Sequence, residues 1–136
     1  MLEIENLVCC YGKVEALKRV SIVVHAGELV TLIGANGAGK TTTLRAISGL
    51  LRKTAGRVMF EGQDITHASP RQILRSGIAH SPEGRHVFPD MTVQENLEMG
   101  CYLRSDPAAI STDMTTAVAR TKTRNRNAIA GYCAGC

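Results

Sequence analysis

Residues 29–43 read Leu-Val-Thr-Leu-Ile-Gly-Ala-Asn-Gly-Ala-Gly-Lys-Thr-Thr-Thr, and this stretch decides how the rest of the chain is interpreted. Residues 34–41 match the pattern G-x-x-x-x-G-K-[ST], a loop that wraps the phosphates of a nucleotide. Glycines let such a backbone curl so that successive N–H groups converge on one anion. Lys40 adds a positive charge for the β and γ phosphates, and the Thr41 hydroxyl is placed to ligate Mg²⁺. The stretch therefore predicts a site for a nucleoside triphosphate.

The residues on either side of this loop fit the same interpretation. Leu29–Ile33 is a short apolar run, typical of a strand that is buried on both faces, and we predict a strand over residues 28–33. A helix is expected from about residue 40 to residue 51, and its positive end would point at the phosphates. The competing interpretation is a glycine-rich turn beside a lysine that contacts nothing.

Composition narrows the class of protein. The 136 residues amount to about one domain, which is short for a complete two-lobed enzyme of this kind. No run approaches the roughly 18 apolar residues of a membrane span, and the N-terminus lacks a secretory pattern, so we expect a cytoplasmic protein. The five cysteines make a poor disulfide framework, and Cys133 and Cys136 are interpreted as a chance C-x-x-C pair rather than a zinc or redox site.

The net charge of +4 is confined to one end of the chain. Residues 1–114 carry 12 basic and 12 acidic side chains, whereas residues 115–136 carry Arg120, Lys122, Arg124 and Arg126 and no acid. The distribution of charge along the chain therefore does not indicate a uniformly basic face, and we expect no nucleic-acid partner.

Local signals predict the remaining elements. Alternation of apolar and polar residues begins a half-buried antiparallel strand over residues 2–11, and residues 54–56 are read as a break before a further strand. Ser69 with Pro70 is a helix start, and Thr92 with Glu95 forms a capping box. The expected elements are strands at 20–24, 57–60 and 78–81, and helices at 70–77 and from Thr92 to about Leu103.

Beyond about residue 104 the pattern decays. Residues 111–128 are dominated by Thr, Ala, Arg and Asn and show no apolar periodicity. Such a segment has little to bury, so we expect residues 105–136 to be a disordered or only transiently helical tail. The organised domain is predicted to be residues 1–104.

Several segments together resemble the ATP-binding subunit of ABC transporters. They are Tyr11-Gly12, the loop 34–42, Gly62-Gln63-Asp64-Ile65 and Thr-Val-Gln-Glu-Asn-Leu at 92–97. The segment 81–89, Ser-Pro-Glu-Gly-Arg-His-Val-Phe-Pro, looks most like subunits that drive uptake of branched-chain amino acids. The resemblance covers residues 1 to about 114. It implies an α/β fold, the N-terminal part of a P-loop NTPase domain, with an antiparallel β subdomain, an incomplete parallel core and a poorly ordered C-terminal tail.

The resemblance also assigns roles to residues. ATP and Mg²⁺ are the implied ligands, with Tyr11 stacking on adenine and Thr41 and Glu83 contacting the metal. Arg85, His86 and Phe88 would face the membrane permease. The phosphate-contacting set is Gly34, Asn36, Gly37, Ala38, Gly39, Lys40, Thr41 and Thr42. The implied partners are permease subunits and a second ATP-binding subunit, and the implied location is the inner face of the cell membrane.

Parts that the family uses for turnover are missing from the sequence. There is no Leu-Ser-Gly-Gly segment, no apolar strand ending in Asp-Glu and no histidine after His86, so no catalytic residue is identified. One hypothesis is that residues from about 114 are out of frame. Two alternatives stay open: a nucleotide-binding module or pseudogene product that does not hydrolyse ATP, and a different P-loop enzyme such as a kinase or GTPase.

Overall fold

The computed structural model describes residues 1–84 and 87–123 of the chain. The chain divides into two compact units, Met1–His80 and Ser81–Cys136. The sequence suggests a boundary at residues 104/105, whereas the structural division comes earlier, between His80 and Ser81.

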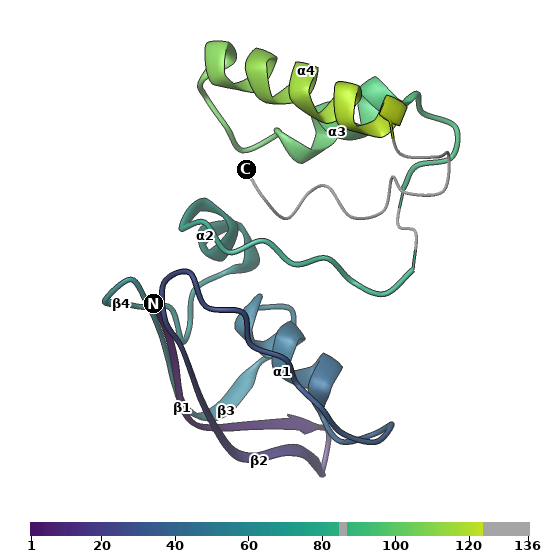
Figure 1. The fold of residues 1–136 in the computed structure, drawn as a ribbon. Coiled ribbons are helices and arrows are strands. Elements are labelled where there is room, and N and C mark those ends of the chain that lie inside the picture. The colour runs from purple at the N-terminus through teal and green to yellow at the C-terminus, as the bar shows by residue number, and fades with distance from the viewer. Residues whose placement is uncertain (85–86, 124–136) are drawn as a thin grey trace. The chain divides into compact units, whose positions relative to one another are not determined.

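Within the described residues, the first unit is built on an antiparallel sheet of four strands in the order β2-β1-β3-β4 (Figure 1). The strands are Leu2–Tyr11 (β1), Val14–Val24 (β2), Lys53–Phe60 (β3) and Gln63–Asp64 (β4). Strand β1 pairs with β2 on one side and with β3 on the other, and its side chains Ile4, Leu7 and Cys9 are at most 1% exposed. The predicted antiparallel β subdomain is therefore confirmed.

The predicted break at residues 54–56 is wrong, because these residues lie inside β3. Gly56 allows strand β3 to continue through this position. Its φ of +89° is a left-handed conformation, and a Cβ built on it would lie 2.4 Å from the carbonyl oxygen of Asn6. The pairing of β1 with β3 shifts register between Glu5 and Val8, beside this close approach. A glycine that reads as a turn in the sequence is thus the point where two strands touch.

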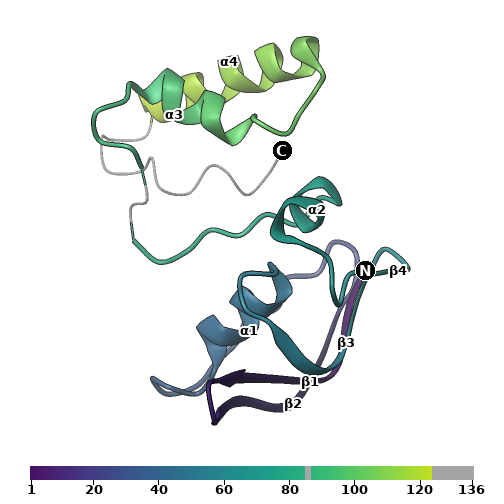
Figure 2. The same cartoon turned by 180° about the vertical axis from the view of Figure 1, so that it is seen from behind.

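Two helices of the first unit complete its core (Figure 2). Helix α1 spans Lys40–Ile47 and ends four residues before the predicted position, while α2 spans Pro70–Arg75. The predicted start of α2 is confirmed, since Ser69 and Gln72 form a reciprocal capping box with Pro70 in the first turn. The buried core consists of Ile4, Leu7, Cys9, Leu17, Ala46, Ile47, Val58, Ile65 and Ile73.

Residues 28–33 do not form the predicted strand. They belong to no strand of the described sheet, and Leu29 and Ile33 are 94% and 93% exposed. A run that is apolar on both faces becomes a strand only when neighbours pair with it and cover it. The described residues supply no such neighbour, since residues 78–81, the other predicted core strand, are not in a strand either. The incomplete parallel core implied by the resemblance has no strand in the described part of the chain.

The second unit contains two described helices, α3 (Val93–Gly100) and α4 (Pro107–Thr123). Helix α3 starts at the predicted capping box, in which Thr92 and Glu95 bond reciprocally, and ends before the predicted Leu103. Hydrogen bonds from Thr92 lower the pKa of Glu95.

Helix α4 differs from the tail expected from residue 105 onward. Its start is held by the Asp106 carboxylate, which accepts from the Ala109 N–H at 3.2 Å, and an ion pair of 2.7 Å joins Arg104 to Asp113. The segment lacks an apolar stripe and contains five threonines, so these local bonds and its four alanines support the helix. The rest of the predicted tail, residues 124–136, lies outside the described residues.

Candidate functional site

The candidate site is the loop that leads into α1. A turn closes within it, because the N–H of Ala38 donates to the carbonyl oxygen of Ala35 at 3.1 Å. Gly37 and Gly39 have φ angles of +86° and +88°, which only glycine adopts readily. The glycines of the motif therefore bend the backbone as the sequence predicts, and residues 34–38 are exposed to solvent.

Helix α1 begins without a side-chain cap. Its N-cap residue is Gly39, which has no side chain to accept a hydrogen bond, and its first turn contains no acidic residue. The first N–H groups of a helix have no partner within the helix, and a cap or an anion normally satisfies them. Because α1 has neither a capping side chain nor an acid here, the amides and the positive end of the helix dipole are open to an external anion.

The side chain of Lys40 lies across this loop. Its ammonium donates to the carbonyl oxygens of Gly34 at 2.6 Å and Ala35 at 2.8 Å, and the residue is half-buried. No salt bridge to an acid is found for Lys40 among the described residues, so its charge is not neutralised locally. The loop thus carries a fixed cation beside open amides, which is the arrangement that attracts a polyphosphate.

Three consecutive threonines follow the lysine and lie in different environments. Thr41 is exposed, Thr42 is half-buried and Thr43 is 3% exposed. The Thr43 hydroxyl donates to the carbonyl oxygen of Gly39 at 2.9 Å and ties the helix to the end of the loop. The sequence predicts only that Thr43 lies near the start of the helix, because a run of identical residues gives no sign of which one is buried. Thr41 is an exposed residue, and its hydroxyl is of the kind that can ligate a metal ion.

The phosphate loop lies against the β1–β2 hairpin. A Cβ built on Gly39 would come within 2.8 Å of Leu17 Cδ2 and 3.2 Å of the carbonyl oxygen of Ala16, both on β2. Leu17 pairs with Cys9, and Tyr11 pairs with Val14 at the end of the same hairpin. Tyr11 is therefore about 7 Å along β1 from the point of contact with the loop. Tyr11 is 47% exposed, so the structure brings an exposed aromatic residue and the loop to one end of the sheet.

The other predicted site residues belong to the second unit. Glu83 is exposed, and its role as a metal partner of Thr41 stays a prediction. Phe88 is 53% exposed, while Arg85 and His86 lie outside the described residues. A ready-made cluster of three or more metal-binding side chains is absent from the described residues.

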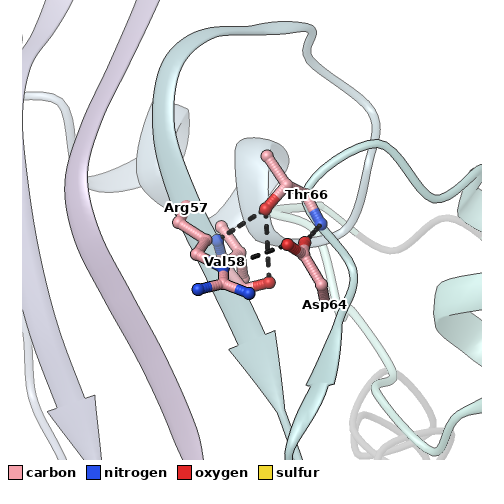
Figure 3. Close-up of polar contacts among 4 residues, drawn as sticks. All are labelled: Arg57, Val58, Asp64 and Thr66. Carbon is pink, nitrogen blue, oxygen red and sulfur yellow. Dashed lines mark hydrogen bonds and ion pairs between the residues drawn. The ribbon is translucent and has the colours of Figure 1, made fainter.

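A separate polar network fixes the segment 62–66 (Figure 3). The Thr66 hydroxyl accepts from the N–H of Val58 at 2.9 Å, and the Asp64 carboxylate accepts from the N–H of Thr66 at 2.9 Å and from Arg57 Nε at 3.0 Å. Hydrogen bonds from Thr66, assisted by Arg57, lower the pKa of Asp64 to about 2. The network stays within the sheet and its following turn, so we assign it a structural role.

Comparison with known proteins identifies one family for this chain. The family model described as ABC transporter matches residues 17–132. This match runs past residue 114, where the sequence resemblance is expected to end, and it gives no support to an out-of-frame origin of the residues up to 132.

Curated relatives include ATP-binding proteins of amino-acid, ribose and lipopolysaccharide transport. The chain is 46% identical over 102 residues to the high-affinity branched-chain amino acid transport ATP-binding protein BraG of Pseudomonas aeruginosa, covering 75% of this chain and 44% of that protein. It is 40% identical to a probable branched-chain amino acid transport ATP-binding protein, LivG of Methanocaldococcus jannaschii, covering 74% and 39%. The ribose import ATP-binding protein RbsA of Yersinia pestis is 35% identical, covering 76% and 20%. The chain thus spans less than half the length of these relatives.

Solved structures agree with the fold. An ATP-binding cassette of an ABC transporter is 36% identical, with a TM-score of 0.70 over 82% of this chain and 45% of that one. A cassette described in its ADP conformation is 32% identical, with a TM-score of 0.73 over 90% and 52%.

Proposed function

Because this chain belongs to the ABC transporter family of ATP-binding proteins, we propose that it binds ATP as part of a subunit that energises import of branched-chain amino acids. The observation that carries the proposal is the uncapped start of α1, with Lys40 held on the adjoining loop carbonyls. The choice of substrate is supported by the two relatives whose names specify branched-chain amino acid transport.

The proposed ligands are ATP and Mg²⁺. The amides that follow Gly39 and the ammonium of Lys40 would hold the β and γ phosphates, because the helix start has no side-chain cap and Lys40 is held on the adjoining loop. Thr41, an exposed residue, would contact the metal through its hydroxyl, with Glu83 as a second candidate ligand. Tyr11 would stack on adenine from the end of the hairpin. Bound magnesium would neutralise phosphate charge; the residues named here bind and orient the nucleotide.

We propose ATP hydrolysis for the whole ATP-binding subunit of which this sequence is part. The 136 residues should bind nucleotide with little turnover by themselves, since the sequence contains no Asp-Glu strand to supply a general base for water. A non-hydrolysing module is the second candidate function, favoured by that same lack. A phosphate-release assay distinguishes the two, because turnover that disappears in Lys40→Ala excludes an inert module.

The proposed partners are the membrane subunits of the importer and a second ATP-binding subunit. Both partners are inferred from membership of the family. The proposed location is therefore the inner face of the cell membrane, where the chain would be bound through these partners. A membrane-crossing helix is not found in the described residues, none of whose helices is both long and apolar enough.

Thermal unfolding with and without Mg-ATP tests the binding proposal. A ligand at 100 times its dissociation constant stabilises a fold by about 2.7 kcal/mol, so the melting temperature should rise clearly. Lys40→Ala should abolish the rise, because it removes the only loop cation of the motif. Lys18→Ala, a change at an exposed lysine of β2, is the matched control and should keep the rise. Equal shifts in both variants would contradict the proposed site.

A further inference from the structure

Thr43 lies on the buried face of helix α1, where an apolar side chain would ordinarily pack. It is 3% exposed, and it shares this face with Ala46 and Ile47 of the core. Burying a hydroxyl costs free energy unless a hydrogen bond compensates for the water that it loses. The Thr43 hydroxyl donates to the carbonyl oxygen of Gly39 at 2.9 Å, so its partner is the N-cap residue of the helix.

The carbonyl oxygen of Gly39 accepts two hydrogen bonds from this one residue. The backbone N–H of Thr43 donates to it at 2.8 Å, in addition to the hydroxyl. A backbone carbonyl oxygen has two lone pairs, so both are used. The Gly39 carbonyl is therefore held more firmly than that of a residue that accepts only the first backbone bond of a helix.

Holding this carbonyl also sets the direction of the Lys40 amide. The C=O of Gly39 and the N–H of Lys40 belong to one planar peptide unit, and no cis peptide bond occurs among the described residues. In a trans peptide the two groups point in opposite directions. Because the carbonyl points into the helix toward Thr43, the Lys40 N–H points out of the helix start, where no side chain caps it.

The glycine at the N-cap makes such a restraint useful. Gly39 has a φ of +88°, and glycine changes backbone conformation more easily than other residues. A larger residue that would stiffen this position is excluded, because a Cβ built on Gly39 would lie 2.8 Å from Leu17 Cδ2. A rotation of the Gly39–Lys40 peptide would turn the Lys40 N–H away from a bound phosphate. The restraint must therefore come from another residue.

We propose that Thr43 is a positioning residue of the nucleotide site: its buried hydroxyl fixes the Gly39–Lys40 peptide so that the Lys40 N–H faces the incoming phosphates. The inference rests on the proposed function, which supplies the triphosphate. Fixing the amide in advance lowers the ordering cost of binding. Thr43 acts through the carbonyl of Gly39 and does not itself touch the nucleotide.

Ser48, at the other end of α1, provides a matched control. Its hydroxyl donates to the carbonyl oxygen of Leu44 at 2.7 Å, which is the same bond to the fourth preceding residue, and Ser48 is 9% exposed. At roughly 1.5 Å per residue, it lies about 12 Å along the helix from Lys40. Thr43→Val and Ser48→Ala each delete a buried hydroxyl and its bond, so urea denaturation should show similar losses of stability.

The first experiment measures binding of inorganic tripolyphosphate to the 136-residue chain by calorimetry. This probe carries phosphates without adenine, so stacking on Tyr11 does not contribute. Thr43→Val should raise its dissociation constant about three- to tenfold, the effect of losing one restraining hydrogen bond, and Ser48→Ala should leave it nearly unchanged. Thr43→Ser keeps the hydroxyl and should bind almost as wild type does, whereas Thr43→Cys, with its weaker donor, should not.

The second experiment observes the amide without any ligand. In a chain labelled with nitrogen-15 at lysine, the nuclear magnetic resonance signal of the Lys40 N–H is identified by its loss in Lys40→Arg. Thr43→Val should broaden or shift this signal, because the peptide then exchanges between two orientations. Ser48→Ala should leave it in place. A Lys40 signal that is unchanged in Thr43→Val would overturn the positioning role.

The outcomes separate this role from the proposed function. Equal tripolyphosphate affinity of wild type and Thr43→Val overturns the role of Thr43 and leaves the proposed function standing. Equal losses of affinity in Thr43→Val and Ser48→Ala also overturn it, since they would report only the stability of α1. If the wild-type chain binds neither tripolyphosphate nor Mg-ATP, the proposed function fails and the role fails with it.

A second pair of variants keeps the test decisive if Thr43→Val does not fold. Thr43→Ser and Thr43→Cys have nearly the same size and differ in the strength of the donor. Weaker binding of tripolyphosphate by Thr43→Cys than by Thr43→Ser is the expected result. Equal affinity of these two variants would contradict the proposal.

Discussion

Strand β1 and residues 29–33 are both predicted as strands from their apolar residues, and they differ completely in the structure. Both contain closely spaced apolar residues and both are predicted as strands. Leu7 of β1 is 0% exposed and lies between two paired strands, whereas Leu29 is 94% exposed and belongs to no strand. The difference shows that apolar sequence creates a tendency to pair, while partners elsewhere in the chain decide whether a strand forms.

The largest test of this comparison is a pair of matched truncations. Leu7→Ala should cost about 2–5 kcal/mol of unfolding free energy, because it leaves a cavity in the buried core. Leu29→Ala should change the free energy by less than about 0.5 kcal/mol, since the side chain buries almost nothing. Urea denaturation followed by circular dichroism measures both. Equal losses would mean that residues 29–33 are covered in solution, and the contrast between the two segments would fail.

A second test concerns the close approach that lets β1 pair with β3. Gly56→Ala and Gly62→Ala both place a Cβ at a positive φ, +89° and +76°, so they share a conformational cost of about 1–2 kcal/mol. Of these two glycines, only Gly56 has backbone atoms close to the position of the added Cβ. The carbonyl oxygen of Asn6 would lie 2.4 Å from it. We therefore expect Gly56→Ala to cost about 1–3 kcal/mol more than Gly62→Ala in the same urea assay. Indistinguishable midpoints would argue that the strands separate easily.

The smallest expected effect is a pH dependence at the outer edge of the sheet. The folded pKa of Asp64, about 2, lies below the ordinary value, so its stabilisation is present above about pH 4 and is lost as the pH falls through about 2. Asp64→Asn should flatten the loss of stability between about pH 4 and pH 2. Thr66→Ala should remove more of this slope than Arg57→Met, since hydrogen bonds from Thr66 are the main cause of the low pKa. The reverse order would assign the effect to the ion pair.

Local chemistry was predictable from the sequence wherever neighbouring residues complete the interaction. Thr92 and Glu95 lie three positions apart and cap the same helix turn, and the glycines of residues 34–39 bend the loop that contains them. The stacking and metal roles of Tyr11 and Glu83 remain predictions, although the structure places Tyr11 at the loop's end of the sheet.

What the sequence could not predict depends on distant partners. Gly56 reads as a turn until Asn6 is known to lie against it, and residues 28–33 read as a strand until the absence of a neighbour among the described residues is known. The bonds of Asn96 to Phe88 join residues eight positions apart, and they carry no signature in composition or periodicity.

The exposure of residues 29–33 bears on how a cut chain would behave. Proteases cleave preferentially where backbone is accessible and unpaired, so Leu29–Ile33 is a natural position for a nick. Such a nick would separate the β1–β2 hairpin from the phosphate loop covalently. The two pieces would nevertheless remain together, because β1 pairs from Leu2 to Cys9 with β3, on the far side of the nick.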